Sequence, residues 1–381
     1  MFRFKSFEGG MMKVTLGIIA ISIVIKKLKF VPFDWMVLFY CFYALVSFSW
    51  FPLPKEFFVM AIENQLYPIS MFYIARLYFV SPENFLRNMR TPLLIAFACA
   101  LYLYFFQPSW YLAYKTSSWT YEYSGENYFE HMRLSGFWPW SYFIGYSSLF
   151  LIMYETTKRV VFKEKRPFFV ITIVLSGLVL FFAQQRVSIV YLVVFLFLLL
   201  LVFYKKKLLQ IKKKIFFMIA GLLFVGGVVF FFIAPNLDNS YVEYVSNRSF
   251  SQNSTLVADR FGLYAAHYSN ISFFGDGLGS HSHTMRNFAP KWCISDCDYV
   301  RLLNEVGVFG TFLLGLIIFV PFVKKMKYFR ELFFEYNLIL FLLIAMIGAT
   351  PLEHLPLHPY IYWFCLGKIV VYSDKSSKEY L

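Results

Sequence analysis

The fold is decided by the stretch Asp296-Cys-Asp-Tyr-Val-Arg-Leu-Leu-Asn-Glu-Val-Gly-Val-Phe-Gly310 and the apolar residues that follow it. Over this short stretch the chain changes from charged and polar side chains to an apolar run of membrane length. Such a run fits the hydrocarbon layer of a bilayer, which is about 30 Å thick. The sequence therefore predicts that a polar site meets the lipid at this point.

The composition extends this interpretation to nearly the whole chain. Hydrophobic residues make up 59% of the 381 residues and charged residues only 15%, whereas about a quarter of the residues in soluble domains are charged. So few charges could not cover the surface of a water-soluble fold. We therefore expect an all-α integral membrane protein, with one helical membrane domain over residues 1–381.

Apolar runs of sufficient length predict ten membrane spans. Residues 14–25 form a shorter apolar run, which is either an eleventh span aided by the snorkelling side chains of Lys13 and Lys26 or an interfacial helix. No small-residue cleavage pattern follows that run, so we expect the first spans to act as the insertion signal. The ten predicted spans are 35–53, 57–79, 91–107, 137–156, 168–184, 187–204, 215–234, 302–322, 332–349 and 355–373.

Lysine and arginine collect in alternate loops, and short loops of this kind stay on the cytoplasmic side of a membrane. The net charge of +14 is then a signal of topology, and nucleic acid is not an expected partner. The basic groups lie at 26–29, 158–166, 205–214 and 324–330. The same charge bias assigns three segments to the outer side, namely the first outer loop (108–136), the large outer loop (235–301) and a short segment at 351–359.

The outer loops hold most of the polar chemistry. In the large outer loop, residues 254–268 have the apolar spacing of a short amphipathic helix. The stretch Phe274-Gly-Asp-Gly-Leu-Gly279 suits a tight turn better than a phosphate cradle, because no strand precedes it. All six histidines also fall on the outer side: His131, His267, His281, His283, His354 and His358.

Two of the five cysteines, Cys293 and Cys297, lie in the large outer loop. They form either a disulfide or a pair of thiols, and a metal site is less favoured because two sulfurs do not complete a tetrahedral ligand set. The sequence also shows no compact carboxylate cluster and no His/Cys ligand set, which fits a site without a metal, and no cofactor is expected.

Four arginines are predicted to lie near the outer face. Arg186 occupies a tight turn between two spans, where it either snorkels to the headgroups or binds an anion. Considered one at a time, the other three are expected to be surface or interface residues: Arg133, Arg260 and Arg301. Together the four can form a diphosphate clamp, because each guanidinium group presents paired donors to phosphate.

Acidic residues surround the start of the helix that leaves the large outer loop. Asp296, Asp298 and Glu305 are stabilised there by the helix dipole whatever else they do. One of them can also serve as the general base to a sugar hydroxyl, and a loop histidine can do the same. The sequence leaves this choice open among the acids and His281, His283 and His354.

Four motifs follow one another between residues 130 and 320. They are Arg133-Leu-Ser-Gly-Phe-Trp-Pro, Gln185-Arg186-Val-Ser, the stretch from Asp259-Arg260-Phe to Gly279, and the stretch from Asp296 to Gly310. In kind and order they resemble the bacterial O-antigen polymerase and O-antigen ligase family of polytopic membrane glycosyltransferases, of the C-type class. Ligases of that family carry a catalytic histidine eleven residues before the glycine that matches Gly307, where this chain has Asp296. This departure favours a polymerase, with a ligase as the alternative.

The resemblance implies metal-independent transfer of glycan from a polyprenyl (undecaprenyl) diphosphate carrier onto a lipid-linked repeat unit, at the outer face of the bacterial inner membrane. Its implied partners are that lipid-linked oligosaccharide, membrane lipid and a chain-length regulator protein. The implied catalytic residues are Arg186, Arg260 and Asp296, and the implied substrate-binding residues are Arg133, Arg301, Asp298, His281 and His283.

A transporter or flippase for the same lipid-linked sugars is the alternative from another class. Inverted repeats or interrupted helix pairs are typical of transporters, and the sequence shows neither. A purely structural membrane partner is a third hypothesis.

Overall fold

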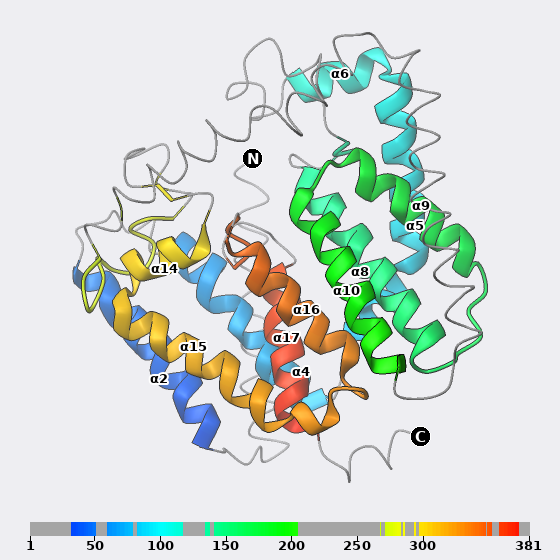
Figure 1. Cartoon of the computed structure of the whole chain (residues 1–381). Coiled ribbons are helices and arrows are strands. Elements are labelled where there is room, and N and C mark those ends of the chain that lie inside the picture. The colour runs from blue at the N-terminus through cyan, green and yellow to red at the C-terminus, as the bar shows by residue number, and fades with distance from the viewer. Residues whose placement is uncertain are drawn as a thin grey trace. The chain divides into compact units, whose positions relative to one another are not determined.

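The computed structural model describes residues 32–50, 59–78, 82–116, 134–137, 141–204, 267, 271–282, 285, 293–294, 297–347, 349–352 and 358–372. Every regular element within these ranges is a helix, and none is a strand (Figure 1). The predicted all-α class is therefore confirmed for the described part of the chain.

The predicted spans overlap described helices, apart from 215–234, which lies outside the described residues together with the run 14–25. Within the described ranges, three helices are long and apolar enough to cross a membrane, namely Pro32–Trp50, Leu86–Phe106 and Gly307–Lys324. Shorter apolar helices cover Phe169–Phe182, Val187–Val202 and Phe333–Ala345. These helices are compatible with a membrane protein.

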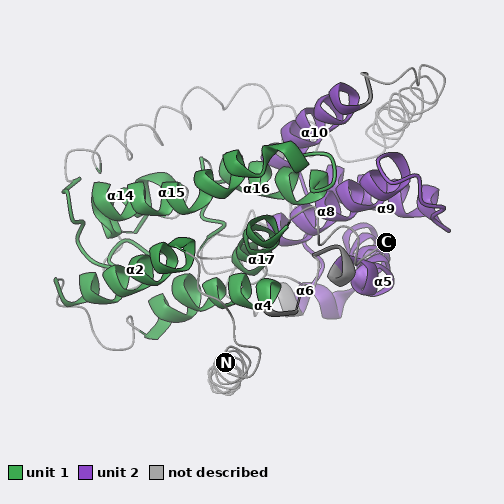
Figure 2. Cartoon of the chain, turned by 90° about the horizontal axis from the view of Figure 1, so that it is seen from below, with its two compact units in different colours: residues 1–84, 262–381 green, residues 85–261 purple. Residues whose placement is uncertain are grey.

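The chain divides into two compact units, coloured separately in Figure 2. Unit 1 comprises residues 1–84 and 262–381, and unit 2 comprises residues 85–261. The predicted single membrane domain and its two outer loops stay a prediction.

Unit 1 is a set of helices drawn from both ends of the chain. α17 packs along α4 and α16, and α15 packs against α2. A Cβ atom on Gly367 of α17 would lie 2.5 Å from the carbonyl oxygen of Phe72 in α4. The glycine thus lets the two backbones approach closely, as small residues do between membrane helices. The helices are α2 (Pro32–Ser47), α4 (Ser70–Tyr78), α14 (Asp298–Glu305), α15 (Gly307–Lys324), α16 (Phe333–Ala345) and α17 (His358–Val371).

The segment that precedes α4 is an irregular helix. A π-helical turn, Ile62–Leu66, is followed by a 3-10 turn, Tyr67–Ile69, which contains Pro68. Single π turns of this sort occur often at functional sites. The predicted span 57–79 is therefore interrupted, and Pro68 was the available signal in the sequence, because proline breaks the helical hydrogen-bond pattern.

Unit 1 has two polar ends. At one end Arg76 of α4 forms an ion pair with Asp34 of α2, and Lys368 Nζ lies 2.5 Å from Glu335 Oε1. At the same end Lys325 Nζ donates to the carbonyl oxygen of Tyr372 at 2.7 Å. This end contains the basic turn after α15, which the sequence assigns to the cytoplasm.

At the opposite end of unit 1 the segments assigned to the outer side meet. The backbone N–H of Asp298 donates to the carbonyl oxygens of Met346 and Ala349. The N–H of Leu278 donates to Ser47 Oγ, at the end of α2. Segments far apart in the sequence but predicted to share one side of the membrane are thus brought together.

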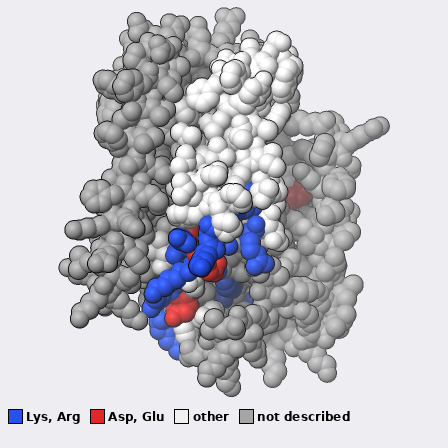
Figure 3. All heavy atoms as spheres, turned by 90° about the vertical axis from the view of Figure 1, so that its right-hand side faces the viewer, with Lys and Arg blue, Asp and Glu red and all other residues white. Residues whose placement is uncertain are grey.

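Unit 2 is built on α8 and α9, which pack against each other and against α10. The buried carboxylate of Glu155 lies 3.6 Å from Arg90 Nη1 and 3.5 Å from Arg166 Nε. Figure 3 shows Lys and Arg side chains, with some Asp and Glu among them, gathered at one end of an otherwise uncharged surface. The helices are α5 (Pro82–Phe106), α6 (Ser109–Thr116), α8 (Ser141–Val160), α9 (Phe169–Phe182) and α10 (Arg186–Tyr204).

Candidate functional site

The short helix α14 turns its polar face into unit 1. Asp298, Arg301 and Glu305 are spaced by three and four residues, which places them on one side of a helix. All three side chains are fully buried. Burial of charged groups is costly unless they are paired, so this face must carry its own counter-charges.

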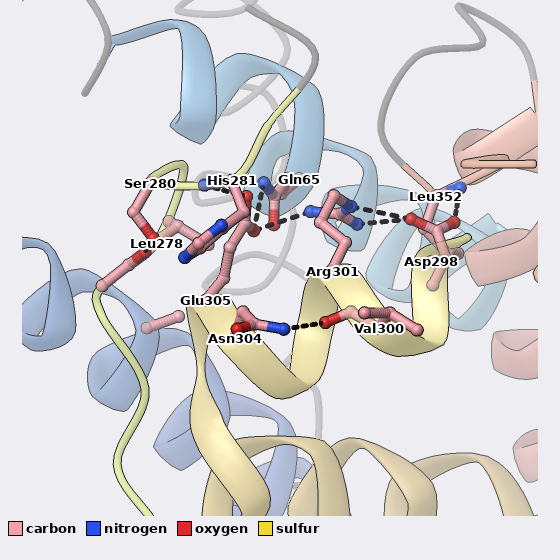
Figure 4. Close-up of polar contacts among 12 residues, drawn as sticks. Gln65, Leu278, Ser280, His281, Asp298, Val300, Arg301, Asn304, Glu305 and Leu352 are labelled. Carbon is pink, nitrogen blue, oxygen red and sulfur yellow. Dashed lines mark hydrogen bonds and ion pairs between the residues drawn. The ribbon is translucent and has the colours of Figure 1, made fainter. Parts of the chain in front are cut away.

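Arg301 is held between the two acids of its own helix (Figure 4). Its Nε and Nη2 atoms lie 2.8 Å and 2.7 Å from Asp298 Oδ1, and its Nη1 atom lies 2.7 Å from Glu305 Oε2. One guanidinium group thus serves two carboxylates. Burial raises the pKa of the Asp298 carboxyl, and the charge of Arg301 opposes that rise.

The remaining carboxylate contacts tie α14 to three other segments (Figure 4). The N–H of Leu352 donates to Asp298 Oδ2 at 2.8 Å, and Gln65 Nε2 donates to Glu305 Oε2 at 2.9 Å. The N–H of His281 lies 3.3 Å from Glu305 Oε1. We call Gln65, Asp298, Arg301 and Glu305 the buried charge network.

The irregular helix before α4 contributes Gln65 to this network. Gln65 lies inside the π turn Ile62–Leu66 and is itself buried. A π turn widens the helix by one residue and so changes which side chains face a neighbour. The interruption is therefore linked in space to the charged helix α14.

A capping turn, residues 272–277, fits between α14 and α15. The N–H groups of Asp276 and Gly277 donate to the carbonyl oxygens of Asn304 and Glu305, at the end of α14. The N–H groups of Val308 and Phe309, at the start of α15, donate to carbonyl oxygens of the turn. Helix ends leave such groups without intrahelical partners, and here one turn serves both ends.

The contact between capping turn and helices depends on glycine. Gly307 has a φ of +68°, and a Cβ atom there would lie 2.3 Å from the backbone nitrogen of Gly275. Gly275 has a φ of +80°, and its own Cβ atom would lie 2.4 Å from the nitrogen of Gly307. The predicted continuous span 302–322 is therefore wrong at its start, because the helix ends at Glu305 and restarts at Gly307 to admit the turn.

The prediction of a tight turn at residues 274–279 is confirmed, since Gly275, Gly277 and Gly279 all have positive φ. The hydroxyl of Tyr43 donates to the carbonyl oxygens of Phe274 and Val306, at 2.8 Å and 2.9 Å. The turn is thus fastened to α2 as well as to α14 and α15.

His281 and Asp276 form a polar pair beside the buried charge network. His281 Nε2 lies 2.8 Å from Asp276 Oδ2. The imidazole of His267 stands edge-on to that of His281, with ring centroids 5.9 Å apart. Burial lowers the pKa of His267, and the neighbouring His281 lowers it further, which favours a neutral His267.

The structure brings together four of the residues singled out from the sequence, namely His281, Asp298, Arg301 and Glu305. Arg301 is buried against its own helix rather than presented to a ligand, so the geometry supports a positioning role for it. Arg186 begins α10, and its side chain lies outside the described part. Arg133, Arg260, Asp296 and His283 also lie outside the described residues.

The sequence analysis missed two members of the site, Gln65 and Asp276. Asp276 was interpreted only as part of a glycine-rich turn, and Gln65 lies in an apolar segment whose periodicity predicts an ordinary span. Glu305 was noticed as an acid near a helix start, and its spacing of four residues from Arg301 was the available signal for their ion pair.

The described part of the chain offers no group of three or more His, Cys, Asp or Glu side chains that could hold a metal ion. The structure does not join Cys293 and Cys297 by a disulfide. What the site offers is a rigid, buried charge network that supports the Asp276–His281 pair.

No protein-family profile, curated protein or solved structure is significantly similar to the chain. The resemblance carried by the four motifs therefore stays a prediction, and function must be argued from the site.

Proposed function

We propose that the protein is a polytopic membrane glycosyltransferase that lengthens a polysaccharide held on a polyprenyl diphosphate carrier. The proposed topology has ten or eleven spans, lies in the bacterial inner membrane, and places the active site on the outer face. A chain-length regulator and membrane lipid are its proposed partners. The alternative acceptor is the lipid A core, which would make the protein an O-antigen ligase.

The buried charge network at the α14 end of unit 1 is the observation that carries the proposal. Segments assigned to the outer side by the positive-inside rule converge there on the head of an apolar helix, Gly307–Lys324. Polar groups buried among apolar helices are costly and usually mark function. A fixed polar site at one face suits transfer between two lipid-linked substrates that remain in that face.

In the proposed mechanism Arg186 and Arg260, with Arg133, stabilise the departing diphosphate. Preorganised cations of this kind act where negative charge develops in the transition state. Asp296 and His283 stay candidates for contacts with the acceptor, whereas Asp298 is fully buried and engaged by Arg301 and the N–H of Leu352. Arg301 shapes the site, because its guanidinium group is already engaged by Asp298 and Glu305.

A transporter for the same lipid-linked sugars is the second candidate, and one observation favours it. The irregular helix at Ile62–Ile69 is an interruption of the sort found near the binding sites of transporters. Transporters usually have such helices in matching pairs, and the described residues of unit 1 contain this one π turn.

The glycan of a deletion strain separates these functions. We expect single-repeat glycans, because loss of a polymerase leaves repeat units unjoined. An uncapped core would instead indicate a ligase, and lipid-linked intermediate accumulated in the inner leaflet would indicate a transporter. An unchanged ladder of chain lengths would exclude all three.

Complementation of that strain tests the arginine clamp. Arg186→Ala and Arg260→Ala should each abolish long chains at an unchanged protein level, and lysine should restore them poorly because it lacks paired donors. Arg159→Ala, which changes an exposed arginine at the end of α8, should leave the ladder normal. Normal ladders in both Arg186→Ala and Arg260→Ala would reject the clamp.

A further inference from the structure

Solvent reaches the α14 end of unit 1 at Asp276. The side chains of Asp298, Arg301 and Glu305 are 0% exposed, and that of His281 is 3% exposed. The side chain of Asp276 is 29% exposed. Among these charged groups and their histidine neighbour, Asp276 is thus the one that a substrate in the outer face can touch.

The backbone of Asp276 is fixed on both sides. Its N–H donates to the carbonyl oxygen of Asn304 at 2.7 Å, and the next N–H, that of Gly277, donates to Glu305 at 2.8 Å. The flanking residues Gly275 and Gly277 have φ of +80° and +110°, a conformation that other residues rarely adopt. The carboxylate therefore projects from a turn with little freedom to move.

The side chain of Asp276 is fixed as well. His281 Nε2 lies 2.8 Å from Asp276 Oδ2, and the backbone N–H of His281 is anchored on Glu305 Oε1 at 3.3 Å. The chain of contacts runs from Arg301 through Glu305 and His281 to Asp276. The buried charge network thus orients one partly exposed carboxylate.

A purely structural role, in which the contact between Asp276 and His281 only holds the capping turn in place, explains this contact less well. The capping turn is already closed by the hydrogen bond from the N–H of Gly275 to Ser272 Oγ, at 2.7 Å. It is also joined to both helices through its backbone. A preoriented acid at an accessible tip is what base catalysis on a sugar hydroxyl requires.

We propose that Asp276 is the general base for the acceptor hydroxyl and that His281 is its positioning residue. This inference rests on the proposed glycosyl transfer. Asp276 Oδ1 takes the proton of the hydroxyl while the hydroxyl oxygen bonds to the anomeric carbon of the donor sugar. The bond from that carbon to the diphosphate breaks, and its electron pair leaves with the diphosphate. Asp276 then releases the proton to solvent on its exposed side.

The test uses the purified full chain and the lipid-linked repeat unit isolated from the deletion strain. Asp276→Asn should lower kcat by about 10²–10⁴-fold with little change in KM, the size expected for loss of a general base. His281→Ala should lower kcat by about 10- to 100-fold, the size of one hydrogen bond to a charged group. Glu164→Gln, at a 41% exposed acid in unit 2, should behave as wild type.

Chemical rescue separates catalysis from fastening. Formate should restore part of the activity of Asp276→Ala, since it supplies a carboxylate where one was removed, and imidazole should not. If Asp276→Asn fails to fold, the His281→Ala variant decides the question. A wild-type kcat in Asp276→Asn overturns the assignment. It is also overturned if imidazole rescues His281→Ala and Asp276→Asn loses less activity than His281→Ala does. Failure of the wild-type chain to lengthen the repeat unit refutes the proposed function instead.

Discussion

Arg301→Ala should lower the free energy of unfolding by about 3–5 kcal/mol, because it removes the shared cation of two buried carboxylates. Asp298 and Glu305 would then face each other's charge without compensation, in a site from which solvent is excluded. A loss of this size is a large part of the roughly 5–15 kcal/mol by which folded proteins are stable. The measurement is thermal unfolding of the detergent-solubilised full chain, together with the protein level in cells.

Arg159→Ala is the matched control for this substitution. Arg159 is exposed at the end of α8, so its loss should change stability by no more than about 0.5 kcal/mol. A second control neutralises the whole group with Asp298→Asn, Arg301→Met and Glu305→Gln combined. Because a buried ion cluster can be replaced by neutral groups at small cost, the triple variant should be more stable than Arg301→Ala. Equal stability of Arg301→Ala and Arg159→Ala would contradict the charge-network account.

Gly307→Ala should detach the capping turn and abolish glycan lengthening. A left-handed φ costs an ordinary residue about 1–2 kcal/mol, and here the new Cβ atom would also lie 2.3 Å from the nitrogen of Gly275. The backbone of Gly275 cannot yield as a flexible side chain can, so the turn and Asp276 must move. We expect a loss of stability of at least about 2 kcal/mol, measured by thermal unfolding, and single-repeat glycans in the complemented strain.

Gly315→Ala is the control for Gly307→Ala, since both lie in α15. A Cβ atom on Gly315 would meet nothing within 4 Å. Alanine is favoured over glycine in a helix interior by about 1 kcal/mol, so this variant should be as stable as wild type or more so. If the two alanine variants unfold at the same temperature, the glycine contact is not what joins α14, α15 and the turn.

Much of the helical architecture could be predicted from the sequence, because hydrophobic runs and basic loops are local signals. The runs at 35–53 and 168–184 correspond closely to Pro32–Trp50 and Phe169–Phe182. The convergence of residues 297–302 and 349–352 also agrees with their assignment to one side of the membrane. These features depend on composition over a window of residues, which a sequence shows directly.

The interruption at Gly307 could not be predicted, because it depends on contacts between distant segments. Gly307 ends a helix only because the capping turn, about thirty residues earlier in the chain, occupies the space beside it. Arg76 of α4 forms its ion pair with Asp34, which lies in another helix, α2. Sequence spacing shows partners within a helix and not across helices.

The candidate site could be predicted only in part for the same reason, since contacts between distant segments are not visible in the sequence. The acid, arginine and acid of α14 are visible as a pattern, but their burial is not, and burial is what changes Arg301 from a predicted phosphate ligand into a positioning residue. Asp276 was hidden in a turn motif, since its importance comes from His281 Nε2 and from its exposure relative to its neighbours. The burial and the contacts of these side chains arise only when the helices pack together.

The proposed function requires that the α14 end of unit 1 faces away from the cytoplasm. Ser272→Cys and Lys327→Cys place single thiols at exposed positions near the two ends of this unit, in a variant whose five native cysteines are replaced by alanine. In intact spheroplasts a membrane-impermeant maleimide should label residue 272, and should label residue 327 only after the membrane is opened. Labelling of residue 327 but not 272 before opening, or of both alike, would contradict an outward-facing site.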